Sequence, residues 1–268
     1  MARITIRTYG PLNDFVESEL RQRPFEREVT LPSSVKDVIE GAGIPHPEIG
    51  AIVVNGEPRD FSALLAHRDR VAVYPFFDSI DDVALPRLRG ALPSPPRFLL
   101  DTHLGKLARR LRLAGFDTLY ANAADDADLA EQAARDGRVL LTRDVELLKR
   151  RAVEFGYFVR ATDAHEQWLE VVSRFALVAH IRAFTRCTRC NGTLRVTTEP
   201  EALARVPADV LVRVSSAAAA RPVRGDQMHE GDVYACSSCG HVYWEGSHTA
   251  RIRAWLADGG APKAGADR

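Results

Sequence analysis

All four cysteines of this 268-residue chain lie in two Cys-x-x-Cys pairs, Cys187–Cys190 and Cys236–Cys239. The two-residue spacing lets both sulfurs of one tight turn face the same ion, and two such turns supply four thiolates. Each pair is followed by residues that favour a turn, Asn191-Gly192 and Gly240. The pattern predicts one structural Zn²⁺ site whose ligands are Cys187, Cys190, Cys236 and Cys239.

Two disulfides are the competing interpretation of the same cysteines. Disulfide scaffolds are typically short secreted chains, whereas this chain has four cysteines in 268 residues and starts Met1-Ala-Arg-Ile4 without an apolar secretory stretch. We therefore favour zinc. A site closed by four thiolates leaves no open position for a substrate, so we expect any catalytic chemistry elsewhere in the chain.

The charge balance and the hydropathy limit the classes of function. Lys plus Arg equals Asp plus Glu, at 36 each, so the bulk charge does not indicate a strongly basic nucleic-acid binder. The hydrophobic content of 46% is sufficient for real cores, and no apolar run reaches the length of a membrane span. We expect a cytoplasmic protein without a membrane partner.

The segment Ala84–Pro96 contains four prolines, which indicates a linker between domains. Before it, alternating strand patterns flank one helix that Ser34 is placed to cap, and Asn55-Gly56 predicts a hairpin turn. The order strand-strand-helix-strand-strand predicts a β-grasp domain. The predicted organisation is a β-grasp domain (1–80), a proline-rich linker (81–96), an α/β domain (97–182), a zinc-ribbon module (183–256) and a disordered tail (257–268).

The α/β domain alternates short apolar strands with helices, which predicts a parallel sheet. Acidic residues follow the strands: Asp101 after the first, Asp125 and Asp126 after the second, Asp144 after the third and Asp163 after the fourth. Ligands of such sheets bind at the carboxyl ends of the strands. Carboxylates that converge there repel one another unless a cation lies between them, and oxygen ligands suit Mg²⁺ or Mn²⁺. Asp101 and Asp144 are the leading candidates for such a metal site.

Helix capping is the structural alternative for each of these aspartates, because every strand leads into a helix and Asp is a favoured N-cap. Two basic side chains, Lys106 and Arg143, are candidates for contacts with phosphate, and a solvated surface is the alternative for both. His241 beside Cys239 is a possible substitute ligand for zinc.

Several of these segments resemble the Mut-seven C-terminal RNase domain, a PIN-like nuclease fold. The resemblance rests on Phe98–Asp117, Arg138–Asp144 and Tyr157–Arg160, on both Cys-x-x-Cys pairs and on Val242–His248. It implies a metal-dependent ribonuclease with an acidic site that acts on RNA. Asp101 and Asp144 match the family's acidic positions best, followed by Asp125, Asp126 and Asp163.

The N-terminal segments Val54–Glu57 and Asp69–Pro75 resemble the ubiquitin-like sulfur carriers of thiamine and molybdopterin synthesis. Those carriers act through a free C-terminal Gly-Gly, but here Pro75 is followed by Phe76 and the chain continues. We therefore expect the β-grasp domain to contact a protein partner. Two alternatives to the ribonuclease stay open, a non-catalytic RNA-binding or ribosome-associated module and a sulfur-transfer adaptor.

Overall fold

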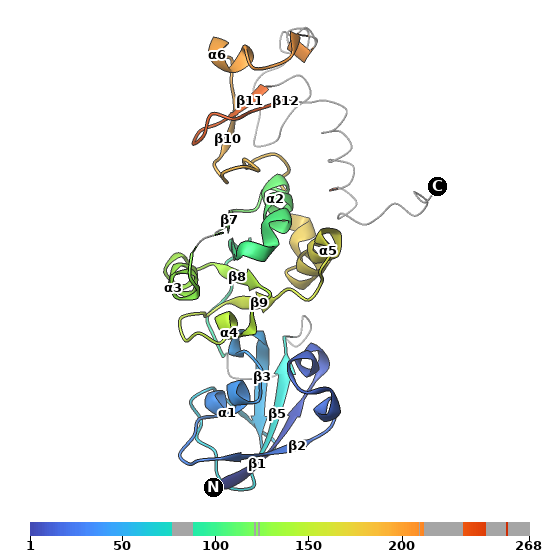
Figure 1. The fold of residues 1–268 in the computed structure, drawn as a ribbon, viewed down its shortest axis with the longest axis vertical. Helices are drawn as coiled ribbons and strands as arrows, with labels where there is room; N and C mark the ends of the chain where they lie inside the picture. Colours follow the sequence, from blue (N-terminus) through green and yellow to red (C-terminus); the bar gives the residue numbers. More distant parts are fainter. Residues whose placement is uncertain are drawn as a thin grey trace, which may run out of the picture. The chain divides into compact units, whose positions relative to one another are not determined.

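The computed structural model describes residues 1–76, 88–120, 122, 124–208, 210–211, 233–244 and 256. These residues form sheets of five, four and three strands (Figure 1). The chain divides into two compact units, Met1–Leu92 with Ala124–Phe158, and Pro93–Ala123 with Val159–Arg268. In the described part of the chain, no helix has the length and apolarity needed to cross a membrane.

The five-stranded sheet belongs to the first unit. Its strands are β1 (Ala2–Thr8), β2 (Phe25–Val29), β3 (Ile49–Val54), β4 (Glu57–Arg59) and β5 (Arg70–Pro75), in the order β2-β1-β5-β3-β4. The central pair β1–β5 is parallel and the other pairs are antiparallel. Helix α1 (Val35–Gly41) buries its apolar side chains in the same core as the sheet. This is the β-grasp arrangement, so the predicted N-terminal fold is confirmed.

Local sequence explains the helix start and the hairpin of this domain. The Ser34 hydroxyl accepts a hydrogen bond from the Asp37 backbone N–H at 3.1 Å, and the Asp37 carboxylate accepts one from the Ser34 backbone. Asn55 and Gly56 have φ angles of 54° and 90°, the left-handed values that a two-residue hairpin requires. The hairpin joins β3 to β4, a strand that the sequence analysis missed because its three residues are exposed and include Pro58.

Three short 3₁₀ turns complete this domain, η1 (Gly10–Phe15), η2 (Ser18–Leu20) and η3 (His46–Glu48). The first unit also contains α3 (Asp126–Asp136), β8 (Val139–Thr142), α4 (Val145–Leu148) and β9 (Gly156–Phe158), with β8 and β9 parallel.

Buried polar contacts join η3 to the segment around β9. The Glu48 carboxylate accepts a hydrogen bond from the Phe158 backbone N–H at 2.6 Å, and His46 Nε2 donates to the Val153 carbonyl at 2.7 Å. In the described part of the proline-rich segment, the Arg89 guanidinium donates to the carbonyls of His46, Pro47 and Ile49. The contacts of the β-grasp domain with β9 and with Arg89 are therefore specific.

The second unit contains β6 (Phe98–Leu100), the 3₁₀ turn η4 (Thr102–Leu104), α2 (Gly105–Leu113), β7 (Thr118–Tyr120), α5 (Ala164–Arg174) and the 3₁₀ turn η5 (Leu177–His180). Strands β6 and β7 are parallel, and β6 to β9 form the predicted parallel sheet in the order β7-β6-β8-β9. Helix α2 buries Leu107 and Leu111 as its periodicity predicts. It also buries the charged residue Arg112.

The three-stranded antiparallel sheet consists of β10 (Leu194–Val196), β11 (Val233–Cys236) and β12 (Val242–Trp244), and α6 (Pro200–Leu203) precedes β11. The predicted hairpin around the second Cys-x-x-Cys pair is present as β11–β12. Strand β10 was not predicted, because only Leu194 of its three residues is buried. The tail predicted to be disordered (257–268) and His248 lie outside the described residues.

Candidate functional site

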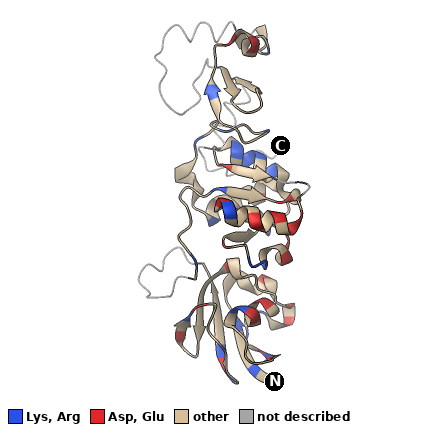
Figure 2. Ribbon diagram, turned by 90° about the vertical axis from the view of Figure 1, so that its left-hand side faces the viewer, with Lys and Arg blue, Asp and Glu red and all other residues tan. Residues whose placement is uncertain are grey.

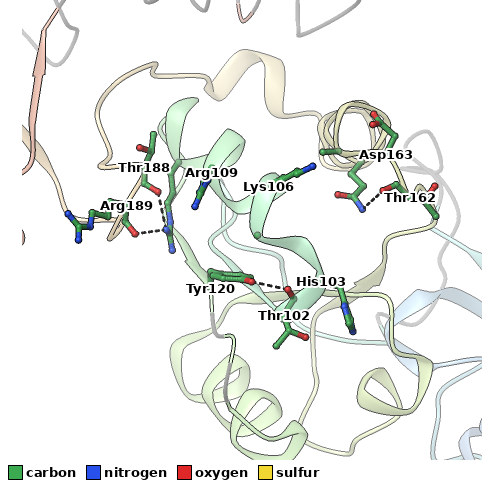
Figure 3. A pocket seen from close by; sticks show the side chains of 13 residues that line it. Thr102, His103, Lys106, Arg109, Tyr120, Thr162, Asp163, Thr188 and Arg189 are labelled. Carbon is green, nitrogen blue, oxygen red and sulfur yellow. Dashed lines mark hydrogen bonds between the residues drawn. The ribbon is translucent and has the colours of Figure 1, made fainter.

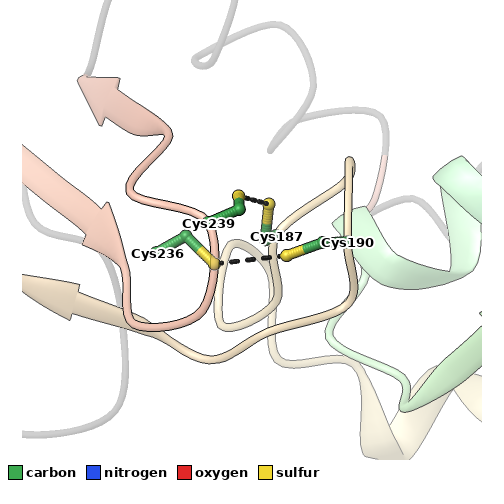
Figure 4. Close-up of side chains that lie close together, drawn as sticks. All are labelled: Cys187, Cys190, Cys236 and Cys239. Carbon is green, nitrogen blue, oxygen red and sulfur yellow. Dashed lines mark hydrogen bonds between the residues drawn. The ribbon is translucent and has the colours of Figure 1, made fainter.

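The four cysteine sulfurs converge on one point (Figure 4). All four lie within 4.8 Å of one another, with 3.7 Å between the sulfurs of Cys187 and Cys239 and 3.4 Å between those of Cys190 and Cys236. A tetrahedron with Zn–S bonds of about 2.3 Å has S···S edges of about 3.8 Å. The spacing therefore suits a metal in a Cys₄ site. A metal site needs at least three His, Cys, Asp or Glu side chains close together. In the described part of the chain, the four cysteines meet this requirement as one group, and His241 does not belong to it.

The turns after the cysteines have the conformation that their sequences favour. Asn191 and Gly240 adopt left-handed φ angles of 70° and 65°. Gly192 is required for space, because a Cβ there would lie 2.5 Å from Ser238 Oγ and 2.8 Å from the sulfur of Cys236. The first turn thus comes close to the second only with glycine at position 192.

The thiol pKa values show that ionising all four clustered thiols is unfavourable without a cation. Burial raises the pKa of Cys190 to about 12, and the neighbouring thiols act in the same direction. Burial also disfavours the Cys187 thiolate, but hydrogen bonds from the Tyr243 hydroxyl and from backbone N–H groups outweigh it and lower the pKa of Cys187 to about 7. The sulfurs cannot all ionise together unless a cation compensates them, which is the chemistry of a zinc site.

The first Cys-x-x-Cys turn is fixed to α2 and β7 by buried hydrogen bonds. Arg112 Nε donates to the Thr118 carbonyl at 2.8 Å, and its Nη1 donates to the carbonyls of Thr188 and Arg189 at 3.2 and 3.1 Å. Burial lowers the pKa of Arg112, and the nearby Cys187 and Cys190 act in the opposite direction. Four thiolates around Zn²⁺ carry a net negative charge, so a buried guanidinium beside them is electrostatically favourable.

Asn191 makes a second set of contacts between this turn and the α/β part of the unit. Its Oδ1 accepts a hydrogen bond from the Thr118 backbone N–H at 2.9 Å, and its Nδ2 donates to the Asp117 carboxylate at 2.8 Å. Both Asn191 and Thr118 are buried. The zinc turn is therefore packed into this unit and is not an independent appendage.

Four of the predicted acidic residues are helix N-caps. Asp101 caps η4, Asp125 caps α3, Asp144 caps α4 and Asp163 caps α5. In each case Oδ1 accepts the backbone N–H of the following turn, at 2.6 to 3.3 Å. These four aspartates therefore act as caps, and a capping carboxylate keeps further lone pairs that can bind a metal.

The acidic candidates differ in their surroundings. Asp101 is 5% exposed and directly follows β6, whereas Asp144 is exposed and lies two residues beyond β8. Asp126 is paired with Arg150 at 3.8 Å, and Asp125 is exposed. Backbone hydrogen bonds from His165 and Glu166 hold the pKa of Asp163 below its usual value. A shared site for Asp101 and Asp144 stays a prediction.

A pocket of about 660 Å³ lies within the second unit (Figure 3). Lys106 and Arg109 project from α2, with Thr188 and Arg189 of the zinc turn to one side and the start of α5 to the other. Its lining contains four Lys or Arg residues and one carboxylate: Thr102, His103, Gly105, Lys106, Arg109, Arg112, Tyr120, Thr162, Asp163, Ala164, Gln167, Thr188 and Arg189. Helix α2 carries four of the basic residues of this unit, which Figure 2 draws in blue.

The predicted phosphate contact Lys106 is thus exposed and lines this pocket. Arg143 is not part of the lining, so its role stays a prediction. The sequence analysis missed Arg109 and Arg189. The basic pattern of α2 was a signal for Arg109, but no local pattern connects Arg189 in a zinc turn with α2.

Family models match almost the whole described chain. One described as the Mut7-C RNAse domain matches residues 96–256, and one described as Mut7-C ubiquitin matches residues 1–81. The chain belongs to the Mut7-C RNAse domain family. The predicted resemblance is confirmed, as are the β-grasp fold at the front of the chain and a cysteine cluster compatible with a zinc ribbon.

Individual proteins are similar to parts of this chain. The human exonuclease mut-7 homolog is 34% identical over 119 residues, which are 41% of this chain, and the chain spans 14% of that protein's length. Solved structures of SAMP1 and of small archaeal modifier protein 1, both from Haloferax volcanii, are 17% and 18% identical. They cover 29% and 28% of this chain and 99% and 98% of their own, with TM-scores of 0.25 and 0.23.

Proposed function

We propose that this protein is a metal-dependent ribonuclease that hydrolyses RNA phosphodiester bonds at Asp101 and Asp144. One observation carries the proposal: in a Mut7-C RNAse domain, a buried aspartate at the end of β6 directly precedes residues that line a basic pocket. Buried carboxylates are rare in proteins unless they are paired or functional. The basic lining beside it suits the polyanionic substrate of a nuclease.

Asp101 and Asp144 each follow a strand of the α/β domain, β6 and β8, and the resemblance matches both to acidic positions of the family. A Mg²⁺ or Mn²⁺ ion held by these carboxylates would activate water and stabilise the charge that develops on the phosphate. Asp125, Asp126 and Asp163 follow the other strands or cap neighbouring helices and are secondary candidates.

Asparagine substitutions test this proposal well, because the aspartates also cap helices. Asn is as good an N-cap as Asp, so Asp101→Asn and Asp144→Asn remove a charged metal ligand and keep the cap. With the zinc-loaded chain in Mn²⁺ or Mg²⁺, we expect each variant to lose about 100-fold or more in RNA cleavage rate. Glu146→Gln, on the helix that Asp144 caps, is the matched control and should keep the parent rate. Cleavage that persists in both aspartate variants refutes the proposal.

A non-catalytic RNA-binding module is the second candidate. The observation that favours it is that Asp101, Asp125, Asp144 and Asp163 all have a structural task as caps. It predicts that the zinc-loaded chain binds RNA and leaves it intact in the presence of either metal. The same cleavage assay therefore decides between the two candidates.

We further propose that the ubiquitin-like domain serves protein contacts and does not carry sulfur. Strand β5 ends at Pro75 and the chain continues into the segment that contains Arg89, so the strand has no free terminus to activate. Mass spectrometry of the chain after incubation with an activating enzyme and a sulfur donor should show no thiocarboxylate.

A further inference from the structure

The basic pocket of the second unit joins two parts of the sequence that are far apart. Lys106 and Arg109 stand one helical turn apart on α2, so their side chains lie on the same face of that helix. Thr188 and Arg189, the turn between Cys187 and Cys190, border the pocket, with the Arg189 carbonyl facing α2 and its side chain pointing away from Lys106 and Arg109 (Figure 3). A volume of about 660 Å³ is within the range of small-ligand sites, so the space admits a nucleotide.

The pocket has cations without internal counter-charges. In the described part of the chain, no carboxylate lies within ion-pair distance of Lys106, Arg109 or Arg189, and all three are exposed. Asp163 is the one carboxylate of the lining, and its Oδ1 accepts hydrogen bonds from the His165 and Glu166 backbones. Such a pocket favours a polyanion.

Tyr120 makes the pocket more specific than a simple anion site. Its hydroxyl donates to the Thr102 carbonyl at 2.8 Å, which holds the ring at the start of α2 (Figure 3). Gly105 permits this position, because a Cβ there would lie 3.0 Å from the Tyr120 hydroxyl oxygen. The ring is half-buried, and a fixed aromatic face beside exposed cations is the arrangement that stacks an unpaired base.

The zinc turn borders the pocket with its backbone (Figure 3). Thr188 and Arg189 are the two residues between Cys187 and Cys190, and their carbonyls both accept hydrogen bonds from Arg112. The backbone that carries the Arg189 side chain is therefore fixed by the cysteine cluster on one side and by α2 on the other. The metal site and the basic pocket share these two residues.

We propose that this pocket binds the sugar-phosphate backbone of single-stranded RNA, with Lys106 and Arg109 on phosphates and Tyr120 stacked on a base. The proposal rests on the proposed function for the choice of RNA as ligand. It gives the zinc turn a structural part in substrate binding, because its backbone borders the pocket and is fixed to α2 through Arg112.

Equilibrium binding tests this without requiring cleavage. A fluorescently labelled single-stranded RNA is titrated with the zinc-loaded full chain carrying Asp101→Asn, in buffer without Mg²⁺ or Mn²⁺. We expect Lys106→Ala and Arg109→Ala each to raise Kd about tenfold, the effect of one lost charge-assisted contact. Each should also lower the slope of log K against log salt by about 0.7, the value for one phosphate of a single strand. Arg135→Ala, on α3 outside the pocket, is the charge-matched control and should bind like the parent.

Two further comparisons separate the pocket from general charge or folding effects. Tyr120→Phe keeps the ring and should bind nearly like the parent, whereas Tyr120→Leu removes the ring and should weaken binding about tenfold. Arg189→Ala should bind RNA like the parent and keep the parent zinc content by elemental analysis, because the carbonyl at 189 and not its side chain faces α2. Weaker RNA binding by Arg189→Ala with unchanged zinc content would overturn the assignment of the phosphate contacts to Lys106 and Arg109.

The outcomes for the pocket and for the ribonuclease are independent. If Lys106→Ala and Arg109→Ala bind RNA like the parent, the pocket proposal is wrong even when the chain cleaves RNA. If they weaken binding and the chain fails to cleave in either metal, the pocket proposal stands and the ribonuclease proposal fails. Duplex RNA that competes as strongly as the single strand would overturn the single-strand assignment.

Discussion

Replacing Asn191 with glycine isolates the contact between the zinc turn and the α/β part of its unit. Glycine tolerates the left-handed φ of 70°, so Asn191→Gly keeps the turn and removes only the side chain. The Thr118 N–H, in a residue with no exposed surface, loses its acceptor, and the Asp117 carboxylate loses a donor. An unsatisfied buried N–H costs about 1–3 kcal/mol and a hydrogen bond to a charged group is worth about 1.5–3 kcal/mol.

The chain has a matched control for this change at Asn55. Asn55 also has a left-handed φ, of 54°, and precedes a glycine. Its Oδ1 accepts from the Arg70 backbone N–H at 2.9 Å and its Nδ2 donates to the Asp69 carboxylate at 2.7 Å, the same pair of bonds that Asn191 makes. The difference is that Asn55 is exposed, so water replaces the lost bonds.

We therefore expect Asn191→Gly to lower the free energy of unfolding by about 3 kcal/mol and Asn55→Gly by about 1 kcal/mol or less. For a unit of this size, 3 kcal/mol lowers Tm by about 6–12 °C. Urea unfolding of the zinc-loaded chain is monitored by the release of zinc to a chromogenic chelator. This readout measures the loss of stability at the cysteine site. Equal costs for the two substitutions would refute the reasoning that burial of the Asn191 contacts holds the zinc turn in place.

Three further predictions concern the cysteine site and the caps. Gly192→Ala should lower the zinc content measured by elemental analysis, because its Cβ would lie 2.8 Å from the sulfur of Cys236; full occupancy would contradict this. Zinc affinity should rise by at least about tenfold per pH unit between pH 7 and 8 in a competition titration, because the Cys190 thiol, with its pKa of about 12, must lose a proton on binding; a flat profile would show that no proton is released. Asp144→Ala should cost about 1 kcal/mol of stability by denaturant titration and Asp144→Asn much less, because Asn keeps the cap; equal costs would exclude capping as the reason.

The sequence predicted the elements whose signals are local. Ser34, Asn55-Gly56 and the two Cys-x-x-Cys pairs each specify a cap, a turn or a ligand set within a few residues, and the structure has all of them. Strands β4 and β10 were missed because they are short and mostly exposed, so they have no hydrophobic period to detect.

The candidate site was less predictable because it depends on contacts between distant segments. Arg112 lies one turn after the buried Ala108, and the carbonyls of Thr188 and Arg189, more than seventy residues away, supply acceptors that make the burial of its charged group favourable. The contact between Arg189 and α2 was equally unpredictable, because the sequence pattern places Arg189 in a metal-binding turn and says nothing of the helix that this turn packs against. For Asp101, local sequence favoured both a cap and a ligand, and the structure shows the cap.

Arg112 binds the residues between Cys187 and Cys190 through their carbonyl oxygens. Backbone carbonyls are the same for every amino acid, so this contact does not restrict which side chains stand at positions 188 and 189. The Thr188 hydroxyl also contacts the Tyr243 hydroxyl, whereas the Arg189 side chain is exposed. Position 189 can therefore change its side chain in a single mutational step while the metal turn and its attachment to α2 persist.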